Sequence, residues 1–128
     1  LGPRFAAAGV PLVFYGINDN PRNYFPDRVM PPGMSGILER PILKRSFEYL
    51  KELMPAAKKA LILFDDDLTA AVVKKEMFND KNDFELFGIK IRMELINDLD
   101  VWKETVAESP DSYDFLVLGL YHTIRDAD

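Results

Sequence analysis

The chain has 128 residues, no Cys and a formal net charge of −5, and 48% of its residues are hydrophobic. This length and composition are ordinary for one compact globular domain. The negative charge argues against a nucleic-acid partner, because phosphate binding requires clustered Lys and Arg. The lack of Cys excludes disulfides, Cys-based metal sites and a Cys nucleophile, and it fits either side of a membrane.

Residues 11–17 are predicted to form a strand buried on both faces, since the run is apolar, rich in β-branched and aromatic residues, and bounded by Gly9 and Asn18. Residues 21–33 are rich in Pro and polar side chains, which predicts an ordered but irregular loop. A second strand is expected at residues 34–38.

A helix is predicted to open at Pro41 and to stop at Pro55, with Leu43, Phe47 and Leu50 at helical spacing. Residues 59–64 are predicted to be a buried strand. Three aspartates follow at 65–67, and they are expected to cap a helix that starts near Leu68.

The last third of the chain is predicted to hold two strands and one helix. Residues 84–87 are interpreted as a helical continuation that ends at Gly88. Residues 89–95 alternate apolar with charged side chains, which favours a strand with one wet face near a sheet edge. Residues 98–108 are predicted to be helical and broken at 109–112, and residues 113–120 to be a fully buried strand.

This order predicts an α/β domain, a Rossmann-like three-layer αβα lobe with a mainly parallel sheet. Ligands of such sheets bind at the carboxyl ends of the strands. Polar residues follow three of the predicted strands, with Asp65 and Thr123 among them. The candidate ligand-binding residues are Asn18, Asp19, Asp66, Asp67, Thr69, Tyr121 and His122.

Four runs of the chain carry a resemblance to a known family: GVPLVFYGIND at 9–19, MSG at 34–36, FEYLKELMPAAK at 47–58 and ALILF at 60–64. Together they resemble the substrate-binding proteins of ABC transporters, in the family of tryptophan and tyrosine binders. The resemblance implies a type I periplasmic binding fold, in which two α/β lobes close on a small molecule. On this pattern residues 1–33 end the first lobe and cross to the second, and residues 34–128 form an incomplete second lobe.

The same resemblance implies a function: binding of an amino-acid-like solute outside the cytoplasm, without catalysis, for delivery to a membrane permease. The chain lacks an initiating Met, which we interpret as a processed product or a fragment. The acidic run at 65–67 departs from the polar turn of the family and favours a cationic or amine-bearing ligand over a free carboxylate.

Three alternatives to a transporter component remain open at this point. The same kind of domain occurs as the extracytoplasmic sensor of histidine kinases, where the partner is a signalling module. Residues 61–68 and 113–120 also resemble a response-regulator receiver, but Gly119 stands at the position of the phosphoacceptor Asp. The third is a degenerate interaction module, which would carry an exposed apolar face and bind no small molecule. Separately, surface exposed between the two lobes is expected to favour self-association into a homo-oligomer.

Simpler roles compete with ligand binding at several of these positions. The acidic run can be a helix cap, Asn18 and Asp19 can form an Asx turn, and His122 can be a surface residue. Trp102 fits the apolar face of its helix. Tyr24 and Phe25 can line a cleft or contact a protein.

The sequence contains no motif for catalysis or for a cofactor. It has no Gly-x-Ser-x-Gly elbow, no phosphate-binding Gly-rich loop and no His-Glu-x-x-His. We therefore expect a binding protein with no cofactor and no metal.

Overall fold

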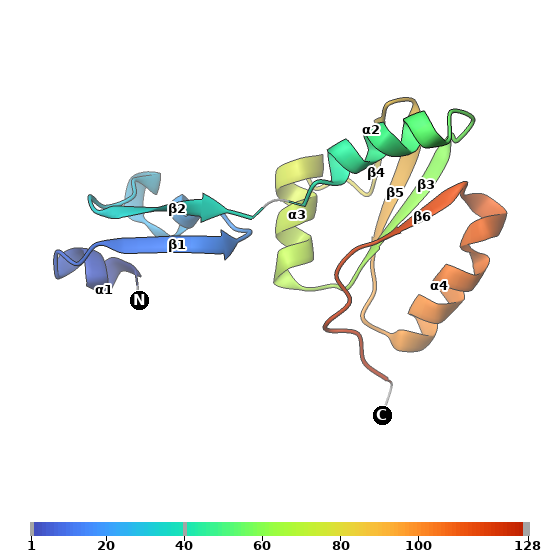
Figure 1. The fold of residues 1–128 in the computed structure, drawn as a ribbon. Coiled ribbons are helices and arrows are strands. Elements are labelled where there is room, and N and C mark those ends of the chain that lie inside the picture. Colours follow the sequence, from blue (N-terminus) through green and yellow to red (C-terminus); the bar gives the residue numbers. More distant parts are fainter. Residues whose placement is uncertain (1, 40, 127–128) are drawn as a thin grey trace. The chain divides into compact units, whose positions relative to one another are not determined.

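The computed structural model describes residues 2–39 and 41–126, which form a small α/β protein with four α-helices and two mainly parallel sheets (Figure 1). The chain divides into two compact units, Leu1–Pro41 and Ile42–Asp128. The assignment of the two parts to lobes of a larger fold stays a prediction.

The N-terminal unit is built on a pair of parallel strands. Helix α1 (Gly2–Ala7) precedes β1 (Leu12–Ile17), two short 3-10 helices follow at Pro21–Tyr24 and Pro26–Arg28, and β2 (Met34–Leu38) pairs with β1. The predicted strand and the irregular loop are thus confirmed. At the pairing of Phe14 with Gly36 the strands lie so close that a Cβ on Gly36 would overlap the Phe14 carbonyl oxygen, so this position requires glycine.

The prediction that the first strand is buried on both faces is wrong for this unit. Val13 and Tyr15 are 79% and 85% exposed, whereas Leu12 and Phe14 on the other face are half-buried. The unit is a two-stranded sheet, and among its described residues no element covers the second face of that sheet. The apolar run in the sequence therefore did not show whether one face or both faces of the strand are covered.

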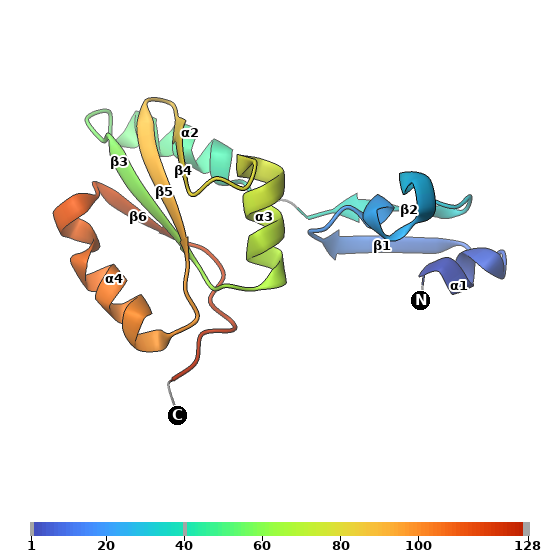
Figure 2. The same ribbon diagram turned by 180° about the vertical axis from the view of Figure 1, so that it is seen from behind.

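The C-terminal unit is a three-layer α/β domain. Its elements in order are α2 (Leu43–Leu53), β3 (Lys59–Phe64), α3 (Leu68–Phe78), β4 (Asp83–Leu86), β5 (Ile89–Leu95), α4 (Leu99–Ser112) and β6 (Phe115–Leu118). The sheet order is β4-β5-β3-β6, and β3 runs parallel to both β5 and β6. Figures 1 and 2 show α2 and α4 on opposite sides of this sheet.

The core lies between the sheet and the pair α2 and α3. Alternate residues of β3 and β5 point into it and meet apolar side chains of both helices; its members include Leu43, Phe47, Ala60, Ile62, Phe64, Val73, Phe78, Ile89, Ile91 and Met93. The opposite face of β3 presents Leu61 and Leu63 toward α4. Trp102 of α4 is buried, as predicted. The most deeply buried strand is therefore β3, one of the two interior strands of the sheet.

The predicted helical continuation at residues 84–87 is wrong, because these residues begin a β-hairpin. Strand β4 pairs antiparallel with β5, and Phe87 and Gly88 form the two-residue connection, both with positive φ. Such a connection matches the twist of a hairpin. Phe84 points inward and stacks on Phe78 with the ring centroids 4.1 Å apart. Exposed and half-buried side chains alternate along β4, as expected for a strand.

Two predicted boundaries near the C-terminus also need correction. Helix α4 continues through Pro110 to Ser112 instead of breaking at residue 109. Proline leaves the Val106 carbonyl without its helical donor, and the Ser109 hydroxyl donates to that oxygen over 2.9 Å. The last strand, β6, is shorter than predicted and only half-buried, because it lies at the edge of the sheet.

Candidate functional site

Three chain segments meet at the carboxyl ends of the parallel strands. The Asp65 N–H after β3 donates to the Leu120 carbonyl over 2.8 Å, and the Arg125 N–H donates to the Asn97 carbonyl over 2.9 Å. The segment that follows β6 therefore crosses the end of β3 and reaches the end of β5. We call residues 120–125 the crossing segment. This is the edge at which parallel α/β sheets bind ligands.

Asp65 is the buried anchor of this edge, with a side chain that is 0% exposed. Its Oδ2 accepts from the Thr123 N–H at 2.9 Å and from the Thr123 hydroxyl at 3.1 Å. Its Oδ1 has no hydrogen-bond partner among the described residues. Burying a polar atom without a partner costs free energy, so this carboxylate holds the crossing segment at some expense to stability.

Asn97 joins the three segments through its side-chain amide. Its Oδ1 lies 2.8 Å from the Asp66 N–H and 3.0 Å from the Thr123 hydroxyl, and its Nδ2 donates to the Asp66 carbonyl at 2.9 Å. The Thr123 hydroxyl has one proton, so it donates either to Asn97 or to Asp65 at a given moment. The role of Asn97 was not predicted from the sequence, although Asn97 stands directly before Asp98, the N-cap of α4.

The three predicted residues of the β3–α3 turn have separate roles. Asp67 caps α3, because its carboxylate accepts from the Ala70 N–H at 2.7 Å. Thr69 is half-buried in the first turn of α3. Asp66 is exposed, and Asn97 fixes its backbone. The helix cap is therefore confirmed for Asp67, and Asp66 is the carboxylate that faces solvent.

Tyr121 and His122 lie on the crossing segment, and both are exposed. Their ring centroids are 5.8 Å apart. Beside Tyr121 is a hollow of about 400 Å³, which is lined mainly by apolar side chains: Leu99, Trp102, Leu118, Tyr121 and Ile124. The carboxyl edge of the unit thus combines a solvent-facing carboxylate with an aromatic and aliphatic hollow.

Asn18 and Asp19 belong to the N-terminal unit, where they follow β1. The Asp19 carboxylate accepts from the Asn20 N–H at 2.8 Å and from the Asn23 side-chain amide at 2.9 Å. A hydrogen bond to this carboxylate also raises the pKa of the exposed Tyr24 phenol. The Asx-type turn lies one residue later than predicted, at Asn20, whose side-chain oxygen accepts from the Arg22 N–H over 3.1 Å. A ligand role for Asn18 and Asp19 stays a prediction.

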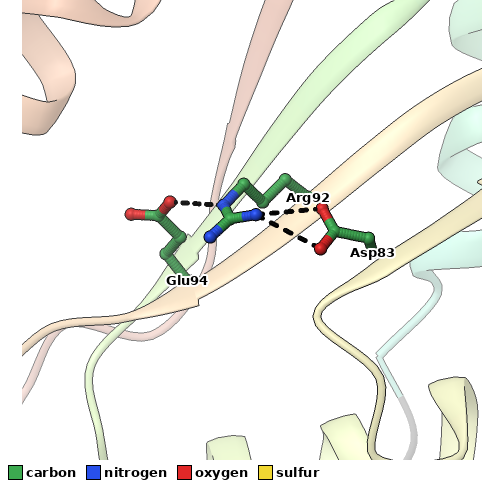
Figure 3. Close-up of polar contacts among 3 residues, drawn as sticks. All are labelled: Asp83, Arg92 and Glu94. Atoms are coloured by element: carbon green, nitrogen blue, oxygen red, sulfur yellow. Dashed lines mark hydrogen bonds and ion pairs between the residues drawn. The ribbon is translucent and has the colours of Figure 1, made fainter.

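A second, larger hollow of about 600 Å³ lies toward the amino ends of β3 and β5. Asp83 and Arg92 line it, and Arg92 donates to Asp83 at 3.1 Å and to Glu94 at 2.8 Å (Figure 3). Hydrogen bonding to Glu94 and the charge of Asp83 raise the pKa of the Arg92 guanidinium. Burial raises the pKa of the Tyr113 phenol on its rim. Arg92 is already paired with two carboxylates, and the other charged residues that line this hollow are Lys59, Lys90 and Glu85.

Comparisons with known proteins do not identify the chain. Searches of protein-family models, curated proteins and solved structures found no match. The resemblance to solute-binding proteins therefore remains a prediction. Among the described residues, no cluster of His, Asp and Glu side chains could hold a metal ion. Within the same part of the chain, no helix has the length and hydrophobicity that a membrane span requires.

Proposed function

We propose that this chain binds a small organic solute at the carboxyl edge of its four-stranded sheet, as part of a type I periplasmic binding fold outside the cytoplasm. In this proposal the chain belongs to an ABC-type uptake system, and a membrane permease is the partner that responds to the bound state. The chain performs no chemistry on its ligand. Its task is to hold the ligand in one geometry.

One observation carries this proposal: three segments distant in sequence converge on a single polar network at that edge. Asp65, Asn97 and Thr123 come from three different loops and are joined by hydrogen bonds of 2.9 to 3.1 Å. Preorganised polar groups beside an apolar hollow are typical of small-molecule sites. The network orients Asp66 without using its carboxylate, which leaves that group for a ligand.

The chemistry of the edge favours a ligand with a cationic head and an apolar body. The Asp66 carboxylate is exposed and accepts charged donors, since an ionised acceptor forms stronger hydrogen bonds than a neutral one. The nearby hollow with Trp102 and Tyr121 offers aromatic surface to the apolar part. A primary amine on an aromatic or aliphatic skeleton fits both features.

A thermal-shift screen of the chain against amines, amino acids, purines and small carboxylates tests this proposal. A ligand that binds only the folded state raises the melting temperature in a concentration-dependent way. We expect a shift from an amine-bearing compound, and we expect Asp66→Asn to abolish it while leaving the melting temperature of the free protein unchanged. Asp111→Asn is the matched control, since Asp111 is an exposed carboxylate on α4 that contributes nothing to this edge.

Two outcomes would contradict the proposal. One is a well-folded protein whose melting temperature responds to no compound of the panel. The other is a specific shift that survives in Asp66→Asn, because the ligand would then bind elsewhere on the chain.

A further inference from the structure

The two edges of the four-stranded sheet differ in charge. One edge strand, β4, carries Asp83 and Glu85. The other, β6, consists of the apolar residues Phe115–Leu118 and pairs only with β3 among the described strands (Figures 1 and 2). Proteins commonly place charges on edge strands to prevent pairing with another chain. β4 has this protection and β6 lacks it.

Exposed apolar side chains gather on the elements around β6. Leu118 of β6 itself is 55% exposed. Helix α2 packs on β6 through Phe47, whose ring lies 5.5 Å from that of Phe115. The same helix and its N-cap leave three large side chains exposed, at Ile42, Tyr49 and Leu53. Their spacing places them on one stripe of the helix, separate from the stripe that faces the core. On the edge strand itself, the exposed apolar side chain is Leu118.

The sequence of β6 is complementary to itself. When two β6 strands run antiparallel about a two-fold axis at Val117, Leu116 lies opposite Leu118 of the second copy. Phe115 then lies opposite Gly119 of the second copy, so the largest residue faces the smallest. All cross-strand pairs in this register are apolar, and such pairs stabilise a sheet. The same operation at β4, centred on Phe84, would place Asp83 against Glu85 of the second copy, which is unfavourable.

We propose that two copies of this chain associate through β6, with the two strands antiparallel about a two-fold axis at Val117. The interface is isologous, because the same strand serves on both sides. It joins the two four-stranded sheets into one continuous sheet and closes the unprotected edge. Each copy carries a net charge of −5, so added salt screens the mutual repulsion and strengthens the association.

Sedimentation of the 128-residue chain over low to high micromolar concentration tests the proposal. We expect a species of twice the chain mass of 14.6 kDa, favoured by salt and by concentration. Leu118→Lys places a charge in the apolar ladder and should convert this species to monomer. Leu68→Lys is the matched control, because Leu68 is 73% exposed on α3, away from β6. The Leu68→Lys variant should remain a dimer. Circular dichroism checks that both variants fold.

Cysteine cross-linking tests the register, since the chain has no Cys of its own. Val117→Cys should be joined efficiently by a short bifunctional thiol reagent, because the two-fold axis places the two thiols opposite each other. Leu68→Cys should not. A wild-type chain that stays monomeric across the concentration range overturns the proposal. So does a dimer that persists in Leu118→Lys or in which Val117→Cys fails to cross-link.

Discussion

Asp65 and Asp66 are neighbours in the sequence with opposite structural roles. Asp65 is fully buried and accepts two hydrogen bonds from Thr123, whereas Asp66 is exposed and its carboxylate forms no hydrogen bond or ion pair with a described residue. The first fixes the crossing segment and the second faces solvent. Stability and ligand binding should therefore respond to different members of the same acidic run.

Chemical denaturation separates the two roles. Asp65→Ala leaves the half-buried Thr123 N–H without its acceptor, and we expect the free energy of unfolding to fall by about 1 to 3 kcal/mol. Asp66→Ala should change it by less than about 0.5 kcal/mol, as is usual for exposed positions. Equal losses in the two variants would contradict the assignment of Asp65 as the anchor.

Asp114 gives the C-terminal unit a dependence on acid. Its carboxylate accepts from the backbone N–H groups of Lys58 and Lys59 at 2.7 and 2.8 Å, and these bonds lower its pKa below the usual value of 3.8. Because the pKa is lower in the folded state, this stabilisation is complete above the pKa of the unfolded chain and is lost as pH falls through the folded pKa. We therefore expect the free energy of unfolding, measured by denaturation at several acidic pH values, to depend less on pH in Asp114→Asn than in the wild type. The same pH dependence in both proteins would contradict this role.

Helix α4 passes through Pro110 because Ser109 replaces the missing donor. The Ser109 hydroxyl donates to the Val106 carbonyl, the acceptor that a residue 110 N–H would otherwise use. Ser109→Ala should lower the free energy of unfolding by about 0.5 to 1.5 kcal/mol. In a Pro110→Ala background the loss should be smaller, since the new N–H takes over the carbonyl. A double-mutant cycle by urea unfolding measures this coupling, and strict additivity would contradict the account.

The end of β6 requires a glycine at 119. A Cβ there would overlap the ring of Phe64, the last residue of β3. We expect Gly119→Ala to lower the free energy of unfolding by about 1 to 3 kcal/mol, as overpacking does. In the double variant Gly119→Ala/Phe64→Leu, the smaller side chain at position 64 leaves room for the new Cβ. The fall in the free energy of unfolding should therefore be smaller than the sum of the falls in the two single variants. Thermal or urea unfolding of the four proteins checks this, and a tolerated Gly119→Ala would show that the contact relaxes freely.

The sequence predicted elements well where the local signal was long and unambiguous. The apolar run at Lys59–Phe64 and the prolines around α2 placed these elements to within two residues. The hairpin at β4 was missed because four alternating residues fit a short helix equally well. The edge position of β6 depends on strand order, which no local pattern contains. Asn97 escaped prediction because its partner Asp66 lies 31 residues away.

At the scale of the molecule, the two units have unequal cores. Among the described residues of the N-terminal unit only Pro21 is buried, whereas β3 of the C-terminal unit is buried along five of its six residues. A unit of this small size has little apolar burial of its own. We expect amide hydrogen exchange to be much slower in β3 than in β1. Comparable protection in the two strands would contradict this ranking.

The central claim is that the carboxyl edge of the sheet binds an amine-bearing solute. The most direct test is an amide NMR titration of the isotopically labelled chain with the compound that gives the largest thermal shift. The account predicts saturable shift changes concentrated at residues 65–67, Asn97 and residues 120–125. Changes concentrated around Arg92 and Tyr113, or no saturable change at the predicted edge, would contradict it.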